Sequence, residues 1–146
     1  LLVNDLTIID SDNICFYLDS VSNNDTLFPK KNYFEIISMV SVANGLMESV
    51  LERRMEIIRP NNEQSKNFIN KQEVRIERTI KWLENNWKNY NENYLTMDQI
   101  AIACSLEYTN FRLNDLWEKN SPNLKKWLNN FRQKDFMKST MPIEAK

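Results

Sequence analysis

The stretch Leu95–Arg112, with the sequence LTMDQIAIACSLEYTNFR, decides the fold. Thr96 suits the N-cap position of a helix, and Gln99 completes the pattern of a capping box. Leu95 before the cap and Ile100 after it have the spacing of a hydrophobic staple. Beyond the cap the segment is apolar on nearly all sides, which is typical of a helix buried by other helices. The sequence therefore predicts a buried central helix.

Apolar residues that recur at helical spacing are expected to form the inward face of this helix. They are Met97, Ala101, Cys104, Tyr108 and Phe111. The chain of 146 residues has two cysteines and no histidine, so we interpret Cys15 and Cys104 as small core residues and expect no metal site. One glycine in the chain and the lack of regularly spaced β-prone runs favour a mainly α fold.

Other helices are expected to pack around the central one. Long helical patterns cover about residues 32–58 and 63–91, and the tight turn between them predicts a helical hairpin. Gly45, in the middle of the first pattern, indicates close approach by another helix or by a ligand. Ser121-Pro122 is typical of a helix start, with Ser121 as N-cap. The inward face of that last full helix is Leu124, Trp127, Leu128 and Phe131.

The first residues differ from the rest of the chain. Two short β-prone runs flank Asn4-Asp5, which predicts a β-hairpin. Ser11 suits the N-cap of a short helix over about residues 12–20, and the turn after that helix leads to Leu27-Phe28-Pro29. Because a lone hairpin is marginally stable in water, we expect further residues upstream.

Charge and hydropathy narrow the class of partner. The formal net charge is −1 and basic residues are not concentrated, so we expect no binding to nucleic acid. We see no charged-then-apolar leader and no run of about 20 apolar residues, so we expect a cytoplasmic protein with no membrane partner. A Ser/His/Asp triad needs histidine, and a phosphate-binding loop needs several glycines, so both are excluded.

Four blocks occur in a characteristic order: Asp10-Ser11 before a short helix, Leu27-Phe28-Pro29, the Leu95–Arg112 helix, and Ser121-Pro122-Asn123-Leu124. In this order they resemble the rear part of a bacterial-type glutathione S-transferase, although the family generally has Asp where this chain has Gln99. The resemblance implies a partial thioredoxin-like domain at 1–22 (its last hairpin and helix), a linker at 23–31 and an all-helical C-terminal domain at 32–146. The expected fold is a glutathione-transferase C-terminal-type helical bundle around a buried central helix, with a remnant N-terminal hairpin.

The resemblance also implies a function, the conjugation of the glutathione thiolate to an electrophile, with glutathione as a substrate. It implies that Asp10 pairs with the ammonium and Ser11 meets the carboxylate of the γ-glutamyl end, as a helix N-terminus favours. The alternative interpretation of Asp10 and Ser11 is simple helix capping. In the family the residue that activates the thiol lies upstream of these segments. We therefore expect a truncated chain with negligible conjugating activity of its own.

Methionine and aromatic side chains on facing helices suit an apolar co-substrate. A pocket for an apolar electrophile is accordingly predicted from Tyr33, Met47, Arg54, Tyr108 and Trp117, with core packing as the alternative. Because family members pair through both domains, the resemblance also implies a possible homodimer. A second class of function stays open, a non-catalytic helical module for protein association, similar to the transferase-like domains of translation factors.

Overall fold

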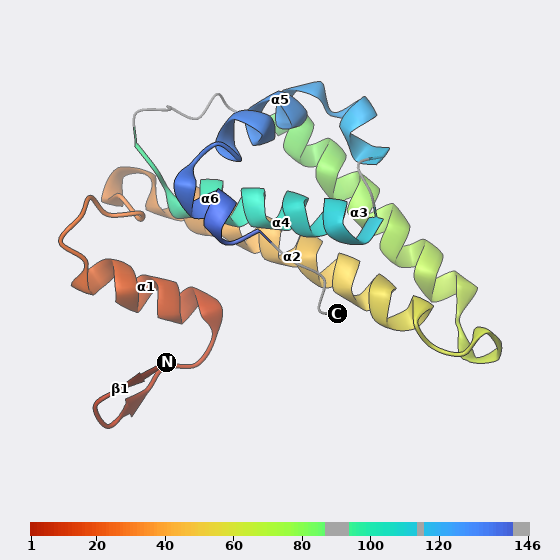
Figure 1. Cartoon of the computed structure of the whole chain (residues 1–146), viewed down its shortest axis with the longest axis horizontal. Helices are drawn as coiled ribbons and strands as arrows, with labels where there is room; N and C mark the ends of the chain where they lie inside the picture. Colours follow the sequence, from red (N-terminus) through yellow and green to blue (C-terminus); the bar gives the residue numbers. More distant parts are fainter. Residues whose placement is uncertain (87–93, 114–115, 142–146) are drawn as a thin grey trace.

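The computed structural model describes residues 1–86, 94–113 and 116–141. Its strands and α-helices are β1 (Leu2–Val3), β2 (Leu6–Thr7), α1 (Ser11–Val21), α2 (Tyr33–Ile57), α3 (Lys66–Asn86), α4 (Met97–Leu113), α5 (Pro122–Phe131) and α6 (Asp135–Ser139). Short 3₁₀ helices lie at Lys30–Asn32, Asn61–Glu63 and Leu116–Asn120. The two strands pair antiparallel, and the hairpin and α1 lie to one side of the helical bundle (Figure 1). The predicted mainly α fold with an N-terminal hairpin is confirmed.

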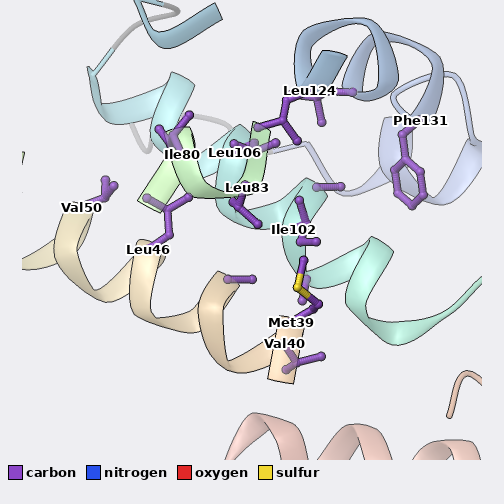
Figure 2. Close-up of a cluster of buried hydrophobic side chains, with 14 of the residues drawn as sticks. Met39, Val40, Leu46, Val50, Ile80, Leu83, Ile102, Leu106, Leu124 and Phe131 are labelled. Carbon is purple, nitrogen blue, oxygen red and sulfur yellow. The ribbon is translucent and has the colours of Figure 1, made fainter. Parts of the chain in front are cut away.

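The core lies where α2, α3 and α4 meet. Leu46 from α2, Leu83 from α3 and Leu106 from α4 are fully shielded from solvent, and their side chains point toward one another (Figure 2). Leu124 and Leu128 of α5 close the core from a further side and are also fully shielded. Burying such a leucine contributes about 1.5–3 kcal/mol relative to exposure. The predicted bundle around α4 is thus confirmed.

The buried side of α4 is not the predicted one. Ile102, Ala103 and Leu106 have no exposed surface, whereas Cys104 is exposed. Of the predicted inward face, only Ala101 is buried, and its other members are exposed or half-buried. The prediction that Cys104 is a core residue is therefore wrong. Apolar residues surround the helix axis, so their spacing alone does not select a side.

Polar residues take places on the buried side of α4 because their hydrogen bonds are made locally. The Ser105 hydroxyl donates to the Ile102 carbonyl at 2.9 Å, and the Thr109 hydroxyl donates to the Ser105 carbonyl at 2.7 Å. A buried hydroxyl that bonds to its own helix avoids the free-energy cost of an unpaired polar group.

The start of α4 agrees with the prediction in position but not in bonding. Thr96 precedes the helix as N-cap, yet its hydroxyl oxygen is buried with no hydrogen-bond partner in the part of the chain that the structure describes. The Gln99 side chain donates instead to the Tyr94 carbonyl at 3.5 Å. The predicted capping box is therefore not formed. Leu95 and Ile100, the predicted staple residues, are half-buried against the core.

The helical hairpin of α2 and α3 is confirmed, with α2 ending within one residue of its predicted end. Residues 61–63 form a 3₁₀ turn, so α3 starts later than expected, and residues 87–91 of its predicted span lie outside the described residues. A Cβ atom at Gly45 would lie 3.6 Å from Nη2 of Arg75, an ordinary contact. Close packing against α3 therefore does not require glycine here.

The start of α5 is capped by a residue from another helix. Ser121 is the N-cap residue as predicted, but its side chain makes no capping hydrogen bond. Instead, the Glu84 carboxylate of α3 accepts from the backbone N–H of Asn123 at 3.0 Å and of Leu124 at 2.9 Å. A carboxylate at a helix N-terminus is favoured by the helix dipole. After α5, the short helix α6, which the sequence pattern did not predict, buries Met137.

The segment Lys30–Ile57 is long and apolar enough to cross a membrane, with a hydropathy of 1.4 in its most apolar window. The sequence interpretation expected no such segment. Its residues Ile36, Val40 and Leu46 are buried in the core that α2 forms with α3 and α4. Length and composition alone therefore do not distinguish a membrane span from a core helix of this bundle.

Candidate functional site

The N-terminus of α1 has an unusual backbone conformation. Asp10 has φ 77° and ψ 135°, a positive φ that residues other than glycine seldom adopt. Such a conformation costs on the order of 1–3 kcal/mol and is found most often at functional sites. Asp10 also serves as the N-cap, since its carboxylate accepts from the Asp12 backbone N–H at 2.9 Å. The predicted cap, Ser11, is instead the first residue of the helix.

Asp10 and Ser11 place complementary groups side by side at this helix end, and both residues are exposed. The cap bond engages Oδ1 of Asp10, so the carboxylate keeps acceptor capacity for a cation. The Ser11 hydroxyl and the N–H groups of the first helical turn are placed to receive an anion. Capping and ligand binding are therefore compatible, and this arrangement suits a ligand that carries an ammonium and a carboxylate close together.

Hydrogen bonds at both ends of α1 hold it in a fixed direction. Nδ2 of Asn44, on α2, donates to both carboxylate oxygens of Asp12 at 3.1 and 3.0 Å. At the other end, Asp19 accepts from the Thr26 hydroxyl at 2.6 Å and from the Leu27 backbone N–H at 2.7 Å. These bonds fix the N-terminus of α1 relative to the bundle, as a preorganised binding site requires.

Two hollows flank α1. A small, partly open hollow of about 70 Å³ lies between α1, α2 and the start of α4, with Cys15, Phe16 and Phe28 in its wall. A wider groove of about 690 Å³ runs along the second half of α1 and the first turn of α4. Asp10 and Ser11 line neither hollow. The polar group at the helix N-terminus is thus a surface site.

The thiols of Cys15 and Cys104 are poor nucleophiles in this structure. Burial, followed by the negative charge of Asp12, raises the pKa of Cys15. Burial, followed by Glu107 and by Cys15 itself, raises the pKa of Cys104, so neighbouring atoms desolvate this thiol although part of the residue reaches solvent. A raised pKa keeps a thiol protonated and unreactive near neutral pH. Within residues 1–86, 94–113 and 116–141, no group of acidic, Cys or His side chains is arranged to hold a metal ion.

The residues predicted to form a co-substrate pocket do not all meet. Tyr33 opens α2 and packs against Phe16, with 6.1 Å between ring centroids. Arg54 lies at the far end of the same helix, about 30 Å away at 1.5 Å per residue, and is exposed. Met47 lies about 10 Å before Arg54 along the helix and is half-buried. A single small molecule does not contact both Tyr33 and Arg54, so the five residues cannot line one pocket.

Tyr108 and Trp117, the other two members of that set, have different surroundings. Tyr108 lies on the half-buried side of α4 with the guanidinium of Arg112 over its ring, 5.5 Å from the centroid. The indole N–H of Trp117 donates to Oδ1 of Asn110 at 2.6 Å. Trp117 therefore helps to join α4 to the segment after it.

Two polar residues of α4, Glu107 and Arg112, differ in their hydrogen bonds. Glu107 accepts from Nε and Nη2 of Arg132, the second at 3.2 Å. The Nε atom of Arg112 is buried and has no hydrogen-bond partner among the residues that the structure describes. Sequence spacing did not separate these cases, since the partner of Glu107 lies 25 residues away along the chain.

Comparison with known proteins identifies relatives by structure. No protein-family model matches the chain, and no curated protein does. A glutathione transferase family member from Pseudomonas fluorescens Pf-5, solved with bound S-(propanoic acid)-glutathione, has a TM-score of 0.91 and 26% sequence identity. The match covers 98% of this chain and 75% of that one.

Two further solved structures extend the comparison. A glutathione S-transferase from Methylobacillus flagellatus KT with glutathione bound gives a TM-score of 0.87 at 25% identity, over 93% of this chain and 70% of that one. A glutathione S-transferase from Methylobacterium radiotolerans JCM 2831, in complex with glutathione sulfonate, gives a TM-score of 0.86 at 16% identity. That match covers 95% of this chain and 68% of the other, and it supports the fold alone. By fold, therefore, this chain is similar to glutathione transferase family members, with a helical bundle of the C-terminal-domain type behind a short β-hairpin.

Proposed function

We propose that this chain binds the γ-glutamyl end of glutathione at the N-terminus of α1, in a protein that conjugates the glutathione thiolate to an electrophile. The observation that carries the proposal is the pairing of Asp10 and Ser11, exposed at a helix N-terminus with Asp10 at positive φ. The Asp10 carboxylate would pair with the ammonium of glutathione, and the Ser11 hydroxyl and N–H would hold the adjacent carboxylate. Neighbours at 25–26% identity that contain glutathione or its S-substituted form support this assignment.

The proposal assigns glutathione binding, but not thiol activation, to these residues. Activation requires a group that lowers the pKa of the glutathione thiol, and raised pKa values make Cys15 and Cys104 poor candidates for catalytic thiolates. We expect negligible conjugation by the 146-residue chain on its own. The proposal retains the division into a thioredoxin-like part at 1–22, a linker at 23–31 and a helical domain at 32–146, a cytoplasmic location and a homodimer.

Calorimetric titration with glutathione tests the site. Asp10→Asn keeps the capping oxygen but removes the charge that would pair with the ammonium. Ser11→Ala removes the hydroxyl. Each change is expected to weaken glutathione binding by about tenfold or more, the usual effect of losing a hydrogen bond to a charged group.

Two matched substitutions control for general effects of the changes. Asp25→Asn alters an exposed aspartate outside the site, and Ser20→Ala alters a serine near the other end of α1. Both are expected to leave the dissociation constant unchanged. Absence of glutathione binding by the unmodified chain would reject the proposed site.

A specific observation favours the second candidate function, an association module. The hairpin and its exit expose large apolar side chains, with Leu2 76%, Leu6 57% and Ile9 76% exposed. Contiguous exposed apolar surface is typical of a docking face. A module of this kind would remain associated with its partner, or with itself, after Asp10→Asn, and would lose association after Leu6→Lys. Calorimetry with glutathione separates the two functions, because only the first requires a site that Asp10→Asn weakens. Sedimentation velocity of the two variants then shows whether the hairpin is the docking face.

A further inference from the structure

Acidic and basic side chains are divided unevenly along the chain. Residues 1–29 contain five aspartates and no lysine or arginine, whereas residues 116–141 contain six basic and two acidic side chains. The hairpin and α1 lie at the bottom of the view in Figure 1 and α5 lies at the top, so acidic and basic parts are separated within one copy. Oppositely charged surfaces attract and orient two molecules as they meet. The charge division therefore indicates association between chains.

The wider groove beside α1, of about 690 Å³, combines an apolar floor with acidic side chains. Leu18, Met97 and Ile100 supply apolar surface, and Asp19 and Asp25 supply the carboxylates. The described residues that line this groove include no lysine or arginine. Leu18 is also half exposed at the edge of the groove. Such a surface is complementary to a partner that is both apolar and basic.

The two carboxylates of the groove keep their negative charge available. Asp19 accepts from the Thr26 hydroxyl and the Leu27 backbone N–H, which are both neutral donors, and each of its oxygens keeps a further acceptor position. Asp25 is exposed. Among the residues that the structure describes, neither carboxylate forms an ion pair. A lysine placed beside them would therefore gain attraction without breaking an existing pair.

The chain carries a surface of the matching kind on α5 and α6. Lys126, Lys134 and Lys138 are exposed there, and Asp135 is an exposed acidic residue among them. Phe136 lies between Lys134 and Lys138 in the sequence and is 39% exposed. Aromatic side chains are frequent anchors of protein interfaces, because they bury a large area in a partner's hollow. The α5–α6 surface thus offers both properties that the groove requires.

We propose that the groove between α1 and α4 of one copy binds the α5–α6 surface of a second copy of this chain. Phe136 would occupy the apolar floor, and the lysines beside it would pair with Asp19 and Asp25. The inference rests on the proposed homodimer and deepens it, since it names the two surfaces that meet. It is independent of glutathione binding. Because the contact joins two different surfaces, two copies related by a twofold axis form it twice.

Sedimentation velocity of the full 146-residue chain tests this contact. Association is expected at about 0.1 M salt and should weaken at about 1 M, where charges are screened over shorter distances. Reversing the charge on either side, by Asp25→Lys or by Lys134→Glu with Lys138→Glu, should weaken association by about tenfold or more. The controls are reversals at other exposed positions, Asp5→Lys and Lys71→Glu with Lys81→Glu. They should leave association unchanged.

A mixture of the two weakened variants gives the sharpest readout. In a mixed dimer the reversed groove meets the reversed surface, and the unmodified groove meets the unmodified surface. Association should therefore return to the level of the unmodified chain, which also shows that both variants are folded. Failure of the mixture to associate would overturn the proposal.

Two further outcomes separate this inference from the homodimer on which it rests. A dimer that survives both charge reversals would overturn the named surfaces and leave the homodimer standing. A chain that stays monomeric at all concentrations would overturn both. Calorimetry with glutathione on the same variants is expected to give unchanged affinities, so failure of the glutathione site would leave this test intact.

Discussion

Truncation of Leu106 to alanine tests whether α4 is the centre of the structure. Leu106 has no exposed surface and lies among Leu46, Ile80 and Leu83 (Figure 2). Removing its three terminal carbon groups forfeits about 2.4 kcal/mol of burial. The cavity left behind raises the expected loss to about 3–4 kcal/mol. For a chain of this size, that loss lowers the melting temperature by roughly 10 °C.

Urea denaturation followed by circular dichroism measures this loss directly. With a slope of about 2 kcal/mol per molar urea, the midpoint is expected to fall by roughly 1.5–2 M. Cys104→Ala, on the opposite side of the same helix, is the matched control and should change stability by less than about 0.5 kcal/mol, because Cys104 is exposed. A loss below about 1 kcal/mol for Leu106→Ala, or a larger loss for Cys104→Ala, would refute the burial pattern of α4.

Two other predictions concern the cap of α5 and the thiols. Glu84→Gln should lower the free energy of unfolding, measured by urea denaturation, by about 1–2 kcal/mol, because two backbone N–H groups of α5 lose a charged acceptor. Glu77→Gln, at an exposed glutamate of α3, is the control and should have little effect. Equal losses of stability in the two variants would contradict the capping role of Glu84. Cys15 and Cys104 should be alkylated more slowly at pH 8 than a free cysteine, with rates that still rise above pH 9, because a raised pKa reduces the thiolate fraction at a given pH. Mass spectrometry after iodoacetamide treatment gives the profile, and a plateau below pH 8.5 would contradict it.

Helices with a distinct apolar stripe were predictable from sequence, and those without one were predictable only in part. The face of α5, with Leu124 and Leu128 inward, followed from spacing and from the proline at its start. The existence of α4 was predictable too, but its apolar residues surround the axis, so tertiary packing decides that Leu106 is buried and Cys104 is not. The cap of α5 by Glu84 joins residues about 40 positions apart, and local motifs do not reveal such bonds.

The candidate site was predictable as a pair of residues but not as a geometry. The sequence placed Asp10 and Ser11 at the start of a short helix, whereas the positive φ of Asp10 and the bond from Asn44 to Asp12 depend on the folded chain. The co-substrate set was less predictable. Residue type alone grouped Tyr33 with Arg54, although the length of α2 keeps them apart.

The most direct test of the central claim is a titration of the ¹⁵N-labelled chain with glutathione, followed by heteronuclear NMR. If the N-terminus of α1 holds the γ-glutamyl end, the amide resonances of Ser11, Asp12 and Asn13 will shift in a saturable manner. Those of α5 will stay in place, and Asp10→Asn will raise the glutathione concentration at half-saturation by about tenfold or more without unfolding the chain. Saturable shifts confined to other helices, or shifts at α1 whose half-saturation is unchanged in Asp10→Asn, would contradict the account.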